Sequence, residues 1–141
     1  MKKLLILTFC SIVLYSSKCD KNKACPDNSH GHFKLQNLSN KALRCIVYWN
    51  YPDSLIGEYN PMNDGTDGVL LGESWTWGPG RGSCWEESLQ NGKKQWLYIF
   101  DQDTISTLTW DVVQQTNRGL LERRLFDLEY LEHHNFNLTY P

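Results

Sequence analysis

The sequence contains none of the short motifs that mark the common enzyme classes. It has no Gly-x-Ser-x-Gly nucleophile elbow, no glycine-rich phosphate loop, and no Cys-x-x-Cys or paired Cys/His spacing for a metal. His133 and His134 lie beside Glu132, and Glu86 precedes Glu87, but neighbouring residues point to different sides of a helix or strand. We therefore expect no enzyme activity, cofactor or metal. A hydrolase that joins these histidines to Glu86 or Glu87 in one cleft is the less favoured alternative.

Positive charge is also scarce. The formal net charge is −2 over 141 residues, and the first 18 residues carry three of the 14 basic side chains. Without that segment, eleven basic residues face sixteen acidic ones, a balance of −5. A protein that binds nucleic acid needs a basic patch, so we predict no nucleic-acid partner.

Long hydrophobic runs are absent except at the N-terminus. Lys2 and Lys3 precede an apolar run over 4–15, and small or polar residues follow it. This length suits the hydrophobic region of a signal peptide, whereas a membrane-spanning helix needs roughly 20 residues. The pattern predicts a cleavable signal peptide over 1–18, and hence an exported protein.

The residues that end this segment are similar to a lipobox. Ser16 and Ser17 precede Cys19, whose thiol would take the lipid and become the new N-terminus. Lys18 departs from the small residue usual at that position, and ordinary signal-peptidase cleavage is the alternative. Lipidation of Cys19 predicts a lipoprotein held to a membrane of the cell envelope, namely an outer-membrane lipoprotein facing the periplasm or the cell surface. The polar residues 19–31 would form a flexible tether.

Export also determines how the remaining cysteines are interpreted, because thiols outside the cytoplasm tend to pair. If Cys19 carries lipid, Cys25, Cys45 and Cys84 remain. The preferred disulfide is Cys45–Cys84, since both lie inside the folded region. Cys25 would then be free, or it could displace either cysteine as a partner. Without lipidation, four cysteines allow three pairings.

The residues 32–141 predict a single β-rich domain. Alternation of apolar and polar residues predicts strands over 33–36 and 43–51, which would pair as a hairpin. Seven of the ten glycines lie between 57 and 82, which indicates a long loop with short strands. The dipeptide Asn91-Gly92 predicts a second hairpin between 84–89 and 95–100, and 96–100 is apolar on both faces, as in a central strand.

The C-terminal part predicts a helix within 106–115, a strand over 118–126 and a short helix over 128–134 that begins after Asp127. A last strand covers 136–140. The expected fold class is mainly β (α+β): an antiparallel β-sandwich, or a single sheet backed by helices, with one or two short helices.

This C-terminal half resembles small exported lipoproteins of Bacteroidetes-type bacteria whose function is uncharacterised. The likeness covers about residues 32–141 and is dense from Trp96 onward. In such proteins a short helix precedes a final strand that ends in a Thr-Tyr-Pro-like tripeptide. The resemblance implies no catalytic residues. It is carried by the run Trp96-Leu97-Tyr98-Ile99-Phe100-Asp101, by Thr104, Trp110-Asp111, Leu125, Asp127-Leu128, Leu131, Asn135 and by the end Thr139-Tyr140-Pro141.

The resemblance also implies a modification. Bacteria of that group O-glycosylate exported proteins at Asp-Ser/Thr-apolar triplets. Asp53-Ser54-Leu55 and Asp103-Thr104-Ile105 both fit, which makes Ser54 and Thr104 candidate sites. The pair Asp103-Thr104 is equally typical of a turn or of a helix cap.

The six tryptophans are the remaining candidates for function. Four lie in apolar patterns and are expected in the core: Trp49, Trp85, Trp96 and Trp110. Trp75 and Trp77 lie in the glycine-rich segment, so with Arg81 they form the predicted binding patch for a protein or glycan partner. The alternative is that these two rings fold back over one end of the core. The function predicted is a non-catalytic binding or interaction module at the envelope; a structural or accessory lipoprotein without a ligand is the alternative.

Overall fold

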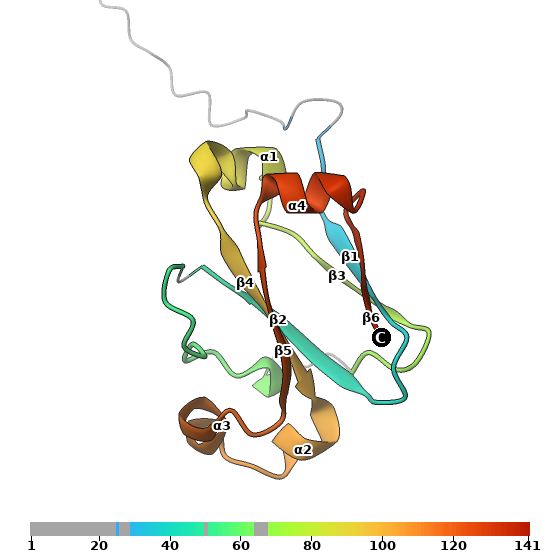
Figure 1. Cartoon of the computed structure of the whole chain (residues 1–141), viewed down its shortest axis with the longest axis vertical. Helices are drawn as coiled ribbons and strands as arrows, with labels where there is room; N and C mark the ends of the chain where they lie inside the picture. Colours follow the sequence, from blue (N-terminus) through green and yellow to red (C-terminus); the bar gives the residue numbers. More distant parts are fainter. Residues whose placement is uncertain (1–24, 26–28, 50, 64–67) are drawn as a thin grey trace, which may run out of the picture.

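Figure 1 shows the computed structural model of the chain, which describes residue 25 and residues 29–49, 51–63 and 68–141. The predicted signal peptide over 1–18 and the lipidation site Cys19 lie outside the described residues. Of the predicted tether, only Cys25 and residues 29–31 are described.

Two three-stranded sheets form the body of the protein (Figure 1). In the first, β1 (Phe33–Asn37) lies between β3 (Ser74–Trp77), which is antiparallel to it, and β6 (Asn137–Tyr140), which is parallel. In the second, β4 (Gln95–Asp101) lies between β2 (Leu43–Tyr48) and β5 (Leu120–Phe126), and all pairs are antiparallel. The predicted fold class, a mostly antiparallel α+β arrangement, is confirmed.

Short helices lie at both ends of the sheets. In Figure 1, α1 and α4 lie at one end and α2 and α3 at the other. The helices are α1 (Trp85–Ser88), α2 (Gln102–Ser106), α3 (Trp110–Thr116) and α4 (Leu128–His133), and two 3-10 segments are η1 (Pro61–Asn63) and η2 (Gln90–Gly92).

The central strand β4 is buried on both faces, as its sequence predicts. On one face, Leu97 and Ile99 belong to the large core cluster that also contains Phe33 and Leu35 of the other sheet. On the other face, Tyr98 and Phe100 join a second cluster that is covered by the loop after β2 and by the helices α2 and α3. Its other buried members are Ile46, Tyr48, Ile56, Ile105 and Val113.

The predicted hairpin between β1 and β2 is wrong, because these strands belong to different sheets. The side chain of Asn37, which is fully buried, organises the crossing. Its Nδ2 donates to the carbonyls of Lys41 and Val69, both at 2.7 Å, and its Oδ1 accepts from the backbone and hydroxyl of Ser39. These bonds turn the chain out of the first sheet and into the second.

The predicted strand over 84–89 is also wrong, because this segment contains α1. Trp85 and Leu89 are both buried, and a helix places residues four apart on one face. Glu86 and Glu87 lie in the first turn, where negative charge favours a helix. Asn91 and Gly92 adopt positive φ values of 61° and 72°, so the tight turn exists, but it joins a helix to β4.

The C-terminal elements follow their predictions more closely. The predicted helix within 106–115 is found as α3, which begins only after Thr109, whereas α2 lies almost wholly before the predicted range and is capped by Asp101. The strand β5 and the last strand β6 form as expected, and Asp127 caps α4 by accepting from the backbone N–H of Tyr130 at 2.9 Å.

Candidate functional site

The predicted patch of Trp75, Trp77 and Arg81 is divided by the structure. Register places Trp77 opposite Phe33 and Trp75 opposite Leu35, and residues directly opposite in an antiparallel pair share a face. Both indoles therefore lie on the core side of the edge strand β3. They are half-buried, stack on each other at 5.3 Å, and Trp75 meets the ring of Phe33 edge-on at 5.9 Å.

The surroundings of Arg81 differ from those of the two tryptophans. It is exposed in the glycine-rich loop and lines a shallow pocket of about 490 Å³ with His32, and neither tryptophan lines that pocket. The two rings thus contribute to one end of the core, while the guanidinium of Arg81 faces solvent. Binding by these three residues stays a prediction.

A second aromatic group was missed, because the sequence pattern placed Trp49 in the core. The exposed fraction of Trp49 is 54%, and Tyr51 is exposed as well. Together they line a pocket of about 270 Å³ whose other lining residues are Ser88, Lys93, Lys94 and Gln95. The signal that could have found it is Pro52, which ends sheet pairing and so releases the residues before it from the alternation.

The ring of Trp49 is supported from behind. It stacks on Trp85 with ring centroids 6.3 Å apart and planes inclined by 15°. Trp85 is fully buried and packs against Phe33 and Phe126, as its predicted core position requires. One face of Trp49 is thereby fixed to the core, which leaves a rigid aromatic surface at the pocket.

Polar groups complete the pocket. The exposed fraction of Gln95 is 1%, and neither its amide oxygen nor its amide nitrogen has a hydrogen-bond partner among the described residues. Buried amides without partners are rare. The Nζ of Lys94 lies 3.3 Å from Asp127, whereas Lys93 is exposed and makes no ion pair among the described residues.

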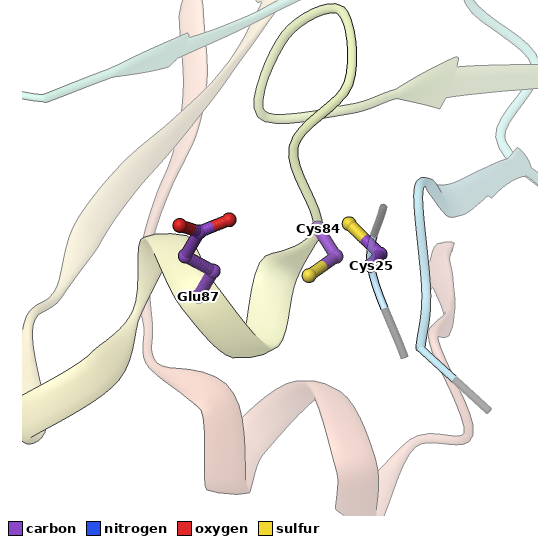
Figure 2. A group of neighbouring side chains, drawn as sticks. All are labelled: Cys25, Cys84 and Glu87. Carbon is purple, nitrogen blue, oxygen red and sulfur yellow. The ribbon is translucent and has the colours of Figure 1, made fainter. Parts of the chain in front are cut away.

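The thiols of Cys25 and Cys84 meet at the start of α1, beside Glu87 (Figure 2). The two Sγ atoms and a carboxylate oxygen of Glu87 all lie within 4.8 Å of one another. Cys84 is buried and Cys25 is partly exposed. A hydrogen bond with Cys84 raises the pKa of the Cys25 thiol, and burial raises it further.

The thiols of Cys25, Cys45 and Cys84 are all free in the structure, and the predicted Cys45–Cys84 disulfide stays a prediction. Cys45 lies on β2 opposite Ile99, inside the core between the sheets, whereas Cys84 lies at the end of the sheets next to Cys25. Burial raises the pKa of the Cys45 thiol to about 12, so this group stays protonated and unreactive at neutral pH.

The segment before β1 is docked on α1 by several contacts. The backbone N–H and the Nδ1 of His30 both lie 2.9 Å from Oε1 of Glu86, and the carbonyl of His30 accepts from the backbone N–H of Trp85 at 3.0 Å. The imidazole of His30 also stacks on Phe136 at 3.7 Å. Burial acts to raise the pKa of Glu86, but the hydrogen bonds from His30 outweigh it, so the pKa is lowered.

The residues of the hydrolase alternative line two different pockets. Glu86 lines one of about 470 Å³ between α1 and α4, together with Glu132. His133 and His134 line another, of about 280 Å³. Asp127 and Glu129 line both pockets, but neither pocket joins His133 or His134 to Glu86 or Glu87.

The two candidate glycosylation sites differ in their surroundings. Ser54 lies in a turn where the backbone N–H of Leu55 donates to Asp53, and Leu55 is exposed. Thr104 lies within α2, where its backbone N–H donates to Asp101, and the following Ile105 is buried. Modification of either residue stays a prediction.

The chain matches no protein-family model, no curated protein and no solved structure. Within the part of the chain that the structure describes, no helix is both long and apolar enough to cross a membrane. The fold and its sites define a small α+β protein of two sheets with an aromatic pocket at its surface.

Proposed function

We propose that the protein is an exported, envelope-anchored binding module without catalytic activity, and that it captures an acidic carbohydrate in the pocket of Trp49, Tyr51, Lys93 and Gln95. The observation that carries this proposal is a pocket lined by two exposed aromatic rings, Trp49 and Tyr51, together with the exposed Lys93. Export and lipid anchoring rest on the N-terminal sequence pattern described above.

The aromatic rings suit a sugar. The C–H face of a pyranose packs on a flat aromatic surface, and a ring that is already fixed loses little conformational entropy on binding. Trp49 meets this requirement, because Trp85 supports it from behind. The pocket volume of about 270 Å³ suits one or two sugar rings rather than a protein surface.

The polar lining suits a carboxylate and hydroxyl groups. The ammonium of Lys93 would attract a uronate carboxylate, and Ser88 offers a hydroxyl beside it. Gln95 also lines the pocket, with its amide atoms buried behind the exposed rings. These groups orient a ligand, and none of them is arranged as a nucleophile with a base.

The test is binding of a galacturonate trisaccharide, compared with a neutral galactose trisaccharide, by titration calorimetry. We expect the acidic sugar to bind and Trp49→Ala to weaken its binding by roughly fivefold, since one stacked ring contributes about 1 kcal/mol. Lys93→Ala should remove the preference for the acidic sugar. The matched control is Tyr59→Ala, which removes an exposed aromatic ring that does not line the pocket.

Binding that is unchanged in Trp49→Ala, or absent for both sugars, would contradict this site. A structural or accessory lipoprotein without a ligand would then be the better description. The anchor is tested separately by intact mass spectrometry of membrane-extracted protein. A lipidated N-terminal Cys19 is expected, and any other N-terminus refutes the anchor.

A further inference from the structure

Outside the aromatic pocket, the side chains of Cys25, Cys84 and Glu87 lie together at the start of α1 (Figure 2). Cys25 precedes the folded domain in sequence and lies 59 residues before Cys84. Nevertheless, the two sulfur atoms lie within 4.8 Å of each other. We propose that Cys25 and Cys84 form a disulfide that fastens the segment before β1 to the start of α1.

His30 lies beside the start of α1. It binds Glu86 through its backbone and its ring, and its carbonyl accepts from Trp85, the residue after Cys84. The two sulfur atoms of Cys25 and Cys84 lie within 4.8 Å of each other, and a disulfide brings such atoms to about 2.05 Å.

The third cysteine of the folded region does not compete. Cys45 is buried between the sheets, opposite Ile99, and burial keeps its thiol protonated. A Cys25–Cys84 bond therefore joins the two thiols that lie within 4.8 Å of each other and leaves the unreactive thiol of Cys45 free. This assignment also resolves the odd number of cysteines that remain if Cys19 carries lipid.

The reaction is a thiol–disulfide exchange with a disulfide oxidant, such as an oxidoreductase in its disulfide form or glutathione disulfide. The partly exposed Cys25 attacks one sulfur of the oxidant as a thiolate, and one thiol of the oxidant leaves. Cys84 then attacks Sγ of Cys25, the Sγ–Sγ bond forms, and the second thiol leaves. Both protons end on the two sulfur atoms of the oxidant, which is reduced as the protein is oxidised.

A metal ion on Cys25, Cys84 and Glu87 is the alternative use of the same groups, and the structure favours it less. It would bring two thiolates and a carboxylate together, and among the described residues no histidine or third cysteine joins the cluster as a fourth ligand. Structural zinc sites have four protein ligands. The proximity of Glu87 also raises the pKa of Cys25, which opposes loss of its proton.

The test is performed on the full chain, purified without reductant, treated with glutathione disulfide and then with N-ethylmaleimide before peptide mapping. We expect one cross-linked peptide pair that contains Cys25 and Cys84, which is lost in Cys25→Ser and retained in Cys45→Ser. The same samples are analysed for bound zinc. Alkylation of both thiols, a bond from either one to Cys45 or to another chain, or stoichiometric zinc with both thiols protected would each overturn the proposal.

Thermal unfolding gives a second readout, and it requires no substitution of the buried Cys84. Closing a loop of this length restricts the unfolded chain, so reduction should lower the Tm of the wild type by an amount on the order of 10 °C. Reduction should leave the Tm of Cys25→Ser unchanged and should still lower that of Cys45→Ser. An equal response of the wild type and Cys25→Ser to reductant would refute the bond. Inside cells the oxidation rests on the proposed export, but neither measurement depends on export or on carbohydrate binding, so the two proposals fail separately.

Discussion

The indole of Trp49 stacks on that of Trp85, yet the first ring is mostly exposed and the second is fully buried. The pair connects the surface pocket to the core between the two sheets, where Trp85 also contacts Phe33 and Phe126. Trp85 is also the first residue of α1, directly after Cys84. The proposed carbohydrate pocket and the proposed disulfide therefore share one short helix as their support.

The two rings of this pair should differ sharply in their effect on stability. Trp85→Ala removes a buried indole and leaves a cavity, so we expect the free energy of unfolding to fall by about 3–5 kcal/mol. Trp49→Ala removes a ring that is half in solvent, and the expected loss is about 1 kcal/mol or less. Urea unfolding followed by circular dichroism measures both. A loss in Trp49→Ala as large as that in Trp85→Ala would contradict the assignment of Trp49 to the surface.

Trp75 and Trp77, on β3, allow a similar test of whether an aromatic ring belongs to the core or to the surface. Because both rings lie on the core side of β3, the double change to Ala should lower the free energy of unfolding by about 2 kcal/mol or more. Arg81→Ala, in the neighbouring loop, is the control and should leave it unchanged. If the double variant keeps its stability but loses a partner, the two rings are a binding patch, as the sequence pattern predicts.

The elements that the sequence predicted correctly are those with strong local signals. The double-sided apolar run of β4 and the cap of α4 by Asp127 both depend on residues that are close in sequence. The pairing of β1 could not be predicted in this way, because Asn37 bonds to Val69, which is 32 residues away. The short segment that forms α1 fits the periodicity of a strand as well as that of a helix. Only the burial of both Trp85 and Leu89, which lie four residues apart, favours the helix.

The candidate sites show the same division. Trp75 and Trp77 stood out because they lie among glycines, although the register of β3 turns them toward the core. The exposure of Trp49 was not predicted, because the alternation of residues between two strand faces continues past Tyr48, the last residue of β2. Cys25 lies in a polar segment with no pattern of its own, so its contact with Cys84 is a property of the folded chain alone.

Asn37 should be among the most sensitive polar residues. Asn37→Leu keeps a similar volume but removes the donor that Asn37 provides to the carbonyls of Lys41 and Val69, of which Val69 keeps the backbone N–H of Leu43 as a second donor. We expect the free energy of unfolding to fall by about 1–3 kcal/mol, the cost of buried polar groups that lose a partner. Asn40→Ala, at an exposed position in the same turn, is the matched control and should change the urea midpoint little. Equal midpoints for both variants would show that the Asn37 amide does not hold the crossing between the sheets.

Asp127 predicts how stability depends on pH. Its carboxylate accepts from the backbone N–H of Tyr130 and pairs with Lys94, and both interactions hold the pKa of Asp127 below its ordinary value. A carboxyl group whose pKa is lowered by folding stabilises the protein fully above the pKa of the unfolded chain, about 3.9, and loses this contribution as the pH falls through its folded pKa. Stability should therefore decline on acidification below about pH 4, in part through this residue.

Two variants separate the cap from the charge. Asp127→Ala removes both and should lower the free energy of unfolding by about 1 kcal/mol at neutral pH. Asp127→Asn keeps an oxygen that can accept from Tyr130 but cannot titrate, so its stability should fall less steeply with acid than that of the wild type. Asp101, whose pKa is lowered by Lys41, is present in all three proteins and cancels in the comparison. Urea midpoints measured from neutral pH down to about pH 2 give the slopes, and parallel slopes for the wild type and Asp127→Asn would show that the Asp127 charge adds nothing to the folded state.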